Sequence, residues 1–377
     1  MRIAFLGDVY TADLDAYPPV DRRIAKLLRE CDHVVANLEG PVTACNNPIS
    51  KTGPVMRQSI VALELLHHLG VDVIGLANNH VLDHGQRGLK DTLELVSAHG
   101  FGFGGAGLSI QQAYSPIRLW SNEARVSVLC AGENGFGCLA PPNRELGYAW
   151  LFHPTLESIL IQEAREADHV IVFCHGGVER IDRPLPEFRR AYHRLVDLGA
   201  SAVIGHHPHV TQGIETYQGA PICYSLGNFC FVKEQAGETW YSSQIPILAV
   251  NRDSVELSEL HHAKLDLARG LLYDEALAPD ERTEGLSAEF ETGEYHRRIN
   301  EDIRELWFTR YINQYEDAVN AFTPPLSGRR LVRRIVSLAL GRTQPFQPLR
   351  VQALLEIESH RWAVARAMRI IVGEEGS

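Results

Sequence analysis

The chain has 377 residues, which is enough to bury a substantial core in one large or two ordinary domains. Its composition, 45% apolar and 22% charged residues, is that of a soluble globular protein. A formal net charge of −11 argues against a general nucleic-acid binder, because neutralising phosphates requires a basic surface.

The seven cysteines form no CxxC pair, and several lie in apolar runs, so we expect free thiols in a reducing compartment. The N-terminal apolar run ends at Asp8, which makes it too short for a signal peptide. No later apolar run approaches the length of a transmembrane helix. These observations predict a soluble, cytoplasmic protein without a transmembrane segment.

Strand-like apolar runs alternate with helical spacing over the first two thirds of the chain. The pattern predicts strands at 3–6, 33–36, 71–76, 126–131, 170–173 and 202–204, with helices at 19–30, 59–69, 89–98, 155–167 and 187–198. This alternation indicates βαβ units in an α/β fold. Further strand-like runs at 214–231 and 245–260 indicate that the sheet is mixed or doubled.

The pattern changes near the C-terminal end, which predicts a catalytic domain over 1–285 and a helical region over 286–377. Helical spacing occupies 294–319 and 351–371. Between them, arginine pairs alternate with apolar residues over 328–336, as on a basic amphipathic helix. This segment is either a solvated helix face or a docking face for an anionic partner.

Five short polar motifs follow the predicted strands, and ligands of α/β sheets collect at the carboxyl ends of strands. The motifs are Gly7-Asp8, Asn37-Leu38-Glu39-Gly40, Ala77-Asn78-Asn79-His80, Cys174-His175-Gly176-Gly177 and Gly205-His206-His207-Pro208-His209. Carboxylate, amide and imidazole groups are ligands of divalent metals. The five motifs together predict one metal site assembled from loops.

The histidine-rich motif is the most specific of the five. In an extended backbone alternate side chains share a face, so we expect His207 and His209 to point together and His206 to point elsewhere. The pairs His67-His68 and His261-His262 do not follow predicted strands, and we expect them at the surface.

Two further motifs supply groups for proton transfer. His80 can remain without a metal and act as a general acid or base, and Asp83 can fix its tautomer. Glu179, close after His175, is a candidate second base.

Taken together, the motifs resemble those of the CapA (poly-γ-glutamate capsule synthesis) family, a branch of the calcineurin-like metallophosphatase superfamily. The resemblance covers about residues 1–235 and rests on Gly7-Asp8, Asn37-Leu38-Glu39-Gly40-Pro41, Ala77–Gly85, His175–Glu179, Gly205–His209 and Tyr224–Phe229. It implies a metallophosphatase-like two-sheet α/β sandwich, to which this chain adds a C-terminal helical extension.

The resemblance also implies roles for individual residues around two metal ions. Glu39 resembles the carboxylate that bridges the two ions, and His80 resembles the acid/base histidine. The ligands of one ion correspond to Asn79, His175 and His207, and those of the other to Asp8 and His209. The mixed donor set suits manganese, zinc, iron or calcium, so the sequence does not identify the divalent metal.

One position departs from the superfamily pattern Asp-x-His, because Tyr10 stands where a histidine is usual. The Asp8 position therefore lacks a strong donor. This departure disfavours the two-metal hydrolysis of phosphoesters.

The family also resembles a peptide epimerase of lasso-peptide biosynthesis that works without pyridoxal phosphate. The resemblance implies a metal-dependent enzyme that inverts a Cα centre of a peptide, including a leader-bearing precursor, through an enolate. His80 is the expected acid or base on one side of the Cα, and Glu179 or His206 the partner on the other. Two alternatives remain open: a metallophosphoesterase or peptide hydrolase, and a non-catalytic capsule or peptide-binding subunit.

Overall fold

The computed structural model describes residues 1–12, 14–122, 124–139, 145–233, 237–273, 281–312, 314 and 348–373. The chain divides into two compact units, Met1–Ile49 with Val55–Tyr295 and Ser50–Pro54 with His296–Ser377. The domain boundary expected at 285/286 falls inside helix α7 (Glu281–Glu289). The arginine-rich segment 328–336 lies outside the described residues.

The first sheet is mixed and carries three of the predicted motifs. Its order is β16-β15-β14-β1-β2-β3-β4, with β13 also paired to β1; β1 to β4 run parallel to one another, and β14 to β16 are antiparallel. The strands are β1 (Arg2–Tyr10), β2 (His33–Leu38), β3 (Val73–Gly75), β4 (Gly102–Gly104), β13 (Asn228–Phe231), β14 (Ser242–Val250), β15 (Val255–Asp266) and β16 (Gly270–Tyr273).

The second sheet carries the two histidine motifs, in the order β11-β12-β10-β9-β7-β6. Strands β7, β9, β10 and β12 are parallel, and β6 and β11 pair antiparallel at the edges. The strands are β6 (Ile117–Trp120), β7 (Arg125–Gly132), β9 (His169–His175), β10 (Ala202–His206), β11 (Ile214–Tyr217) and β12 (Ala220–Cys223). Two short strands, β5 (Ala106–Gly107) and β8 (Gly147–Tyr148), pair separately.

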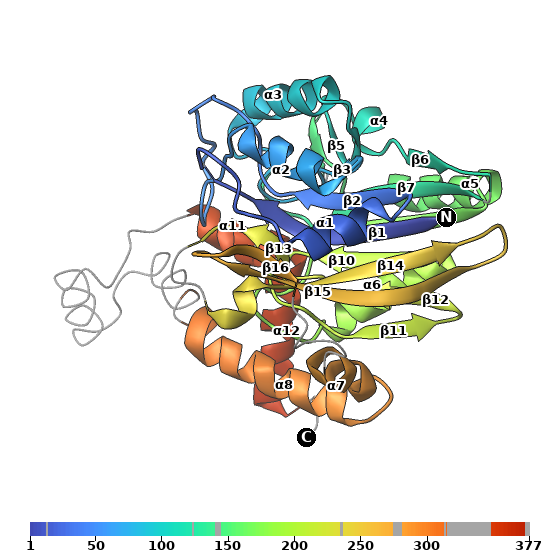
Figure 1. Ribbon diagram of the computed structural model, residues 1–377. Coiled ribbons are helices and arrows are strands. Elements are labelled where there is room, and N and C mark those ends of the chain that lie inside the picture. Colours follow the sequence, from blue (N-terminus) through green and yellow to red (C-terminus); the bar gives the residue numbers. More distant parts are fainter. Residues whose placement is uncertain are drawn as a thin grey trace. The chain divides into compact units, whose positions relative to one another are not determined.

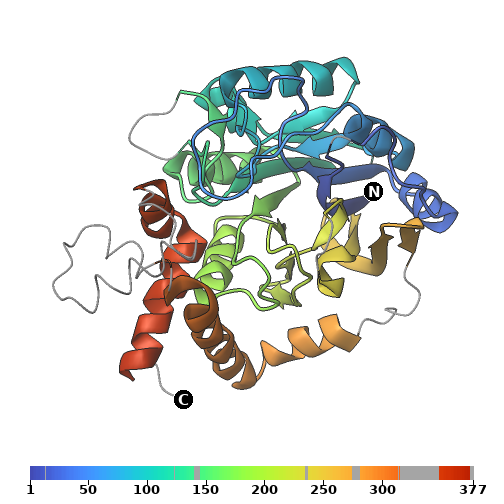
Figure 2. The same ribbon diagram turned by 90° about the vertical axis from the view of Figure 1, so that its left-hand side faces the viewer.

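Helices accompany both sheets, as Figures 1 and 2 show for this first unit. Helices α5 and α6 pack on the second sheet, whereas α1 and α3 contact strands of the first and α1 also contacts α2. The helices are α1 (Arg22–Arg29), α2 (Val61–Leu69), α3 (Gly85–Ala98), α4 (Ile110–Ala113), α5 (Pro154–Glu166) and α6 (Pro186–Asp197), with a 3₁₀ turn at Glu238–Tyr241. The predicted two-sheet α/β sandwich is confirmed.

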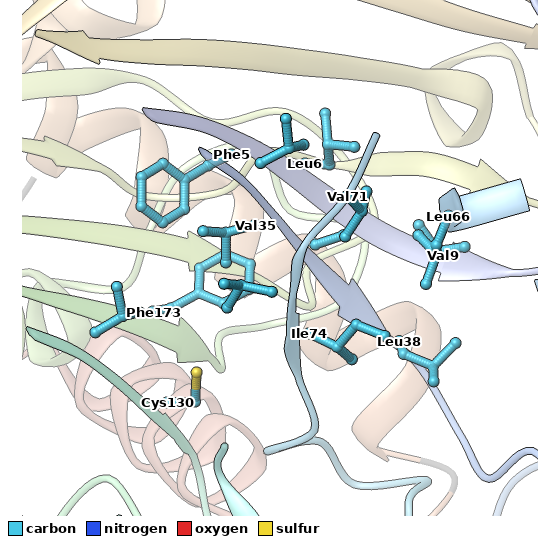
Figure 3. Packing of buried hydrophobic residues seen from close by; sticks show 14 of the residues in the cluster. Phe5, Leu6, Val9, Val35, Leu38, Leu66, Val71, Ile74, Cys130 and Phe173 are labelled. Atoms are coloured by element: carbon cyan, nitrogen blue, oxygen red, sulfur yellow. The ribbon is translucent and has the colours of Figure 1, made fainter. Parts of the chain in front are cut away.

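The core lies between the two sheets, because the strands are apolar on the faces that meet. Phe5 of β1 and Phe173 of β9 are buried, and their ring centroids are 5.7 Å apart. Figure 3 shows them beside Cys130 of β7 and aliphatic side chains of the first sheet, such as Val35 of β2. Parallel strands that are buried on both faces have near-continuous apolar sequences, which explains why β9 and β10 could be predicted from their sequences.

The second unit is helical where the structure describes it. It contains most of α8 (Glu294–Leu306), a π-helical turn (Trp307–Tyr311), α11 (Pro348–Glu356) and α12 (Glu358–Val372). Helical spacing predicted one helix over 351–371, but two are present, because Ile357 has an extended ψ of 122° that ends α11. The apolar period continues across this break, so spacing alone could not reveal it.

Two expectations about surface histidines have different outcomes. His67 and His68 on α2 are exposed, as predicted. The prediction for the second pair is wrong at His262, which is 2% exposed, and His261 is half-buried against Tyr273 and Glu259. Both lie inside β15, which is covered on both edges by β14 and β16.

The packing between the sheets generates a stability prediction. Phe5→Ala should lower the free energy of unfolding by about 3–5 kcal/mol, because it removes a buried ring from the interface of the two sheets. Trp120→Ala is the control, since that side chain is 64% exposed and its loss should change the value by less than about 0.5 kcal/mol. Urea unfolding measures both; equal losses would contradict a core centred on the two facing sheets.

Candidate metal centre

The ends of strands from both sheets bring six of the predicted residues together. Three overlapping groups of buried side chains each converge within 4.8 Å, with one donor atom from each residue. The groups are Asp8–His175–His206, Glu39–His175–His207 and Asp8–Glu39–His209. Asp8 lies inside β1 at a register shift between β1 and its neighbours, whereas Glu39 directly follows β2.

The loop after β10 reaches this cluster through left-handed backbone conformations. The φ angles are 100° at His207 and 59° at His209, so the extended backbone expected there is wrong. Left-handed conformations cost about 1–3 kcal/mol for non-glycine residues and occur at functional sites. The neighbouring loop supports the turn, because the Arg180 N–H donates to the Pro208 carbonyl at 2.8 Å.

His206 also faces the cluster, contrary to the expectation that it points elsewhere. Its Nδ1 lies 2.9 Å from Asp8 Oδ1 and 2.9 Å from His175 Nδ1. The ring is 2% exposed and packs against Phe173, with centroids 4.3 Å apart. All three histidines of the motif therefore belong to one buried constellation.

Asp8 is surrounded by hydrogen-bond donors. Oδ1 accepts from Asn37 Nδ2 at 2.8 Å as well as from His206, and Oδ2 accepts from the His207 N–H at 3.2 Å. His209 Nδ1 lies 3.4 Å from Oδ2. Burial opposes ionisation of Asp8, but the hydrogen bonds from His206 and His209 hold its pKa well below the usual value.

Glu39 has the opposite environment. It is fully buried, and neither carboxylate oxygen accepts a hydrogen bond from any residue that the structure describes. His209 Nε2 lies 3.7 Å and His80 Nε2 4.0 Å from Glu39 Oε1. Burial, and then the charge of Asp8, raises the pKa of Glu39 well above its usual value. A buried carboxylate in this state is stabilised by a cation.

The imidazoles beside Glu39 are suited to metal binding. Burial lowers the pKa of His175 well below its usual value and that of His207 to about 3, so both rings are neutral and offer a lone pair. His207 Nδ1 has no hydrogen-bond partner among the described residues. Asn79 Oδ1 lies 3.1 Å from His175 Nε2. One carboxylate, two neutral imidazoles and an amide oxygen fit a divalent ion.

His209 differs from the other two imidazoles in its charge. Burial favours the neutral ring, but the carboxylates of Glu39 and Asp8 outweigh it and raise the pKa of His209 to about 9. Its Nδ1 lies 2.8 Å from Asn228 Oδ1, and its ring packs 4.5 Å from that of Trp240. The tyrosine at the departing position, Tyr10, packs on Phe231 with ring centroids 5.0 Å apart.

The two predicted proton-transfer groups lie beside the predicted metal ligands. His80 Nδ1 contacts Asp83 Oδ2 at 2.7 Å, and this carboxylate also accepts from the Met56 N–H at 2.8 Å. Asp83 therefore orients the His80 ring so that Nε2 faces Glu39. Glu179 is half-buried, and its charge contributes to the pKa values of Glu39, His207 and His209.

Glu133, a buried carboxylate that follows β7, was not predicted from the sequence. Glu133 is 2% exposed, and its Oε1 lies 3.3 Å from His207 Nε2 and 3.4 Å from the Gly177 N–H. Its position directly after a predicted strand was the available signal, but no histidine or paired acid accompanies it in the sequence. Carboxylates that hold the second nitrogen of a metal-binding histidine fix its tautomer and orientation.

This chain belongs to a family of bacterial capsule synthesis proteins, PGA_cap, whose model matches residues 2–233. The matched segment contains every predicted site residue.

Named relatives have related descriptions. The chain is 32% identical to the PGA biosynthesis protein CapA of Bacillus subtilis over 61% of this chain and 63% of that protein. It is 30% identical to the capsule biosynthesis protein CapA of Bacillus anthracis over 56% and 53%, respectively. A probable polyglutamine synthesis accessory protein of Mycobacterium tuberculosis is 30% identical to this chain, over 52% of this chain and 55% of that protein. The chain thus spans less than two thirds of the length of these relatives.

Solved structures resemble the chain more distantly. A hypothetical protein of Thermus thermophilus aligns with a TM-score of 0.45 and 19% identity, covering 70% of this chain and 99% of that one. A putative 5'-nucleotidase of Staphylococcus aureus aligns with a TM-score of 0.43 and 16% sequence identity. The alignment covers 77% of this chain and 58% of that one. In the described part of the chain, no helix is long and apolar enough to cross a membrane.

The contact between Glu133 and His207 generates a prediction about metal affinity. Glu133→Gln should weaken Mn²⁺ binding by about tenfold or more, because the neutral amide holds the His207 ring less firmly. Isothermal titration with Mn²⁺ measures the effect, and Glu64→Gln on the exposed face of α2 is the matched control. An unchanged dissociation constant would show that Glu133 does not position His207.

Proposed function

We propose that this protein is a divalent-metal-dependent peptide epimerase, which inverts the configuration at a Cα without a pyridoxal cofactor. The observation that carries the proposal is the presence of two proton-transfer groups, His80 and Glu179, beside one buried donor set centred on Glu39. Inversion needs one group to remove the Cα proton and another to return a proton from the opposite side.

The residues expected to hold the metal are Glu39, Asn79, His175 and His207. When bound there, a divalent ion supplies Lewis acidity to the carbonyl next to the reacting Cα, which makes the Cα proton easier to remove.

The chain's own residues would carry the proton transfers. Asp83 Oδ2 accepts hydrogen bonds from the Met56 N–H and from His80 Nδ1. These contacts hold the His80 ring so that its Nε2 lies at a fixed position beside Glu39. Glu179 comes from the separate loop after β9. One group accepts the Cα proton, leaving an enolate, and the other donates a proton to the opposite face. One C–H bond is broken and one is formed, the new proton comes from the donor group, and proton exchange with solvent restores both groups, so the reaction needs no redox partner or second substrate.

Membership of the capsule family supports a peptide substrate that carries carboxylates, with glutamate oligomers as the first class to test. The exposed cations Arg180 and Lys233 lie over the ring of Trp240, at 5.4 and 4.4 Å from its centroid. Trp240 in turn packs on His209. Cations at the edge of the site suit an anionic chain. A leader-bearing ribosomal peptide is the other substrate class that the sequence predicts.

The departure at Tyr10 supports epimerisation over the main alternative, phosphoester hydrolysis. The superfamily pattern places an imidazole two residues after the first aspartate, and Tyr10 provides a phenol that packs on Phe231 instead. Two-metal hydrolysis uses a pair of ions that stabilise both the attacking and the leaving oxygen. An incomplete second donor set disfavours that reaction.

The proposal predicts exchange of a Cα proton with solvent. With Mn²⁺ in D₂O, an oligomer of L-glutamate should gain deuterium at Cα and D-configuration without change of length. His80→Gln and Glu179→Gln should each slow this exchange by about 10²–10⁴-fold, the usual contribution of a general acid or base. His68→Gln, on the exposed face of α2, is the matched control and should leave the rate unchanged.

Mass spectrometry and chiral analysis after acid hydrolysis measure the outcome. Shortening of the oligomer, or turnover of an aryl phosphate that depends on His207, without Cα exchange would replace epimerisation by hydrolysis. Retention of the oligomer with neither reaction would indicate a binding subunit.

A further inference from the structure

The two buried carboxylates of the site differ in their hydrogen bonding. Asp8 accepts from three donors that do not depend on an ion: Asn37 Nδ2 and His206 Nδ1 on one oxygen, and the His207 N–H on the other. A carboxylate offers about four lone-pair positions, so these contacts use most of its capacity. The negative charge of Asp8 is therefore already stabilised by the protein.

Glu39 is stabilised by no such contact. Both of its oxygens lack a hydrogen-bond partner among the described residues, and so does Nδ1 of His207. Both side chains are at least nine-tenths buried and belong to the same converging group with His175. Unsatisfied buried acceptors are rare in native structures, because each costs about 1–3 kcal/mol or more. Three such atoms in one group mark the position of a cation.

The contact between His206 and Asp8 bears on whether a second ion is needed at Asp8. Tyr10 supplies no imidazole there, and the His206 ring reaches Asp8 from the other sheet, with Nδ1 2.9 Å from Oδ1. A neutral imidazole has one N–H donor and one lone pair. When His206 donates that N–H to Asp8, the carboxylate oxygen accepts a hydrogen bond. In a dinuclear site the same oxygen would bind a metal ion.

The remaining donors cannot easily complete a second site. His175 borders both positions, with Nδ1 toward His206 and Nε2 toward Asn79, but a neutral ring can give a lone pair to only one ion. His209 Nδ1 lies 2.8 Å from Asn228 Oδ1, which leaves Nε2 directed at Glu39. Neither imidazole can therefore serve an ion at Asp8 and an ion at Glu39 at the same time.

We infer that the site holds a single divalent ion at Glu39, His175 and His207, and that Asp8, locked by His206 and Asn37, positions the His207 loop and is not a ligand. This inference rests on the metal dependence of the proposed function and is independent of the reaction. It departs from the two-ion arrangement that the family resemblance implies, in which Asp8 and His209 bind a second ion.

The 377-residue protein, stripped of metal by a chelator and titrated with Mn²⁺, provides the test. We expect one Mn²⁺ per chain by calorimetry and by elemental analysis after dialysis. Glu39→Gln should weaken binding by more than about a hundredfold, as loss of a ligand does, whereas Asp8→Asn should weaken it by no more than about tenfold, as loss of an orienting contact does. Circular dichroism and thermal unfolding establish that each variant is folded.

Electron paramagnetic resonance of the Mn²⁺-loaded wild type needs no variant and decides the ion count separately. A lone ion gives the hyperfine pattern of isolated Mn²⁺, whereas two ions about 3.5–4 Å apart are exchange-coupled. Two bound ions, or equal losses of affinity in folded Asp8→Asn and Glu39→Gln, would overturn the inference. Absence of any Mn²⁺ binding would overturn it together with the metal-dependent function, whereas two ions would leave that function standing.

Discussion

The burial of a carboxylate without hydrogen-bond donors is the constraint on which the site depends. Glu39 follows the carboxyl end of β2 in one sheet, whereas His175 ends β9 and His207 follows β10 in the other. The two sheets must pack face to face for these groups to meet, and the Phe5–Phe173 contact lies in that packed interface. The core between the sheets therefore fixes the position of the proposed metal ligands.

The fold also gives the buried histidines of the site different protonation states. Burial keeps His175 and His207 neutral, so they can act as ligands, whereas the two carboxylates keep His209 protonated in the metal-free protein. Asp83 orients His80 from outside the ligand set. Metal binding and proton transfer can thus use neighbouring imidazoles that have distinct environments.

Much of this arrangement could be predicted from the sequence, because it depends on periodicity and on where polar residues end apolar runs. Strands β2, β9 and β10 were predicted within a few residues, and the donors at or just after their ends lie close together. The convergence of all three histidines could not be predicted, since His207 and His209 have left-handed backbone conformations that residue type does not encode. Glu133 escaped prediction because its partner, His207, is distant in the sequence. The break at Ile357 is hidden by an uninterrupted apolar period.

The central claim is that one divalent ion binds at Glu39 and that Asp8 serves it only indirectly. Anomalous diffraction from crystals grown with Mn²⁺ tests this claim most directly. The account predicts one anomalous peak about 2.0–2.3 Å from donor atoms of Glu39, His175 and His207, with Asp8 still bonded to His206. A second peak bound by Asp8 and His209, or a single peak at that position, would contradict it.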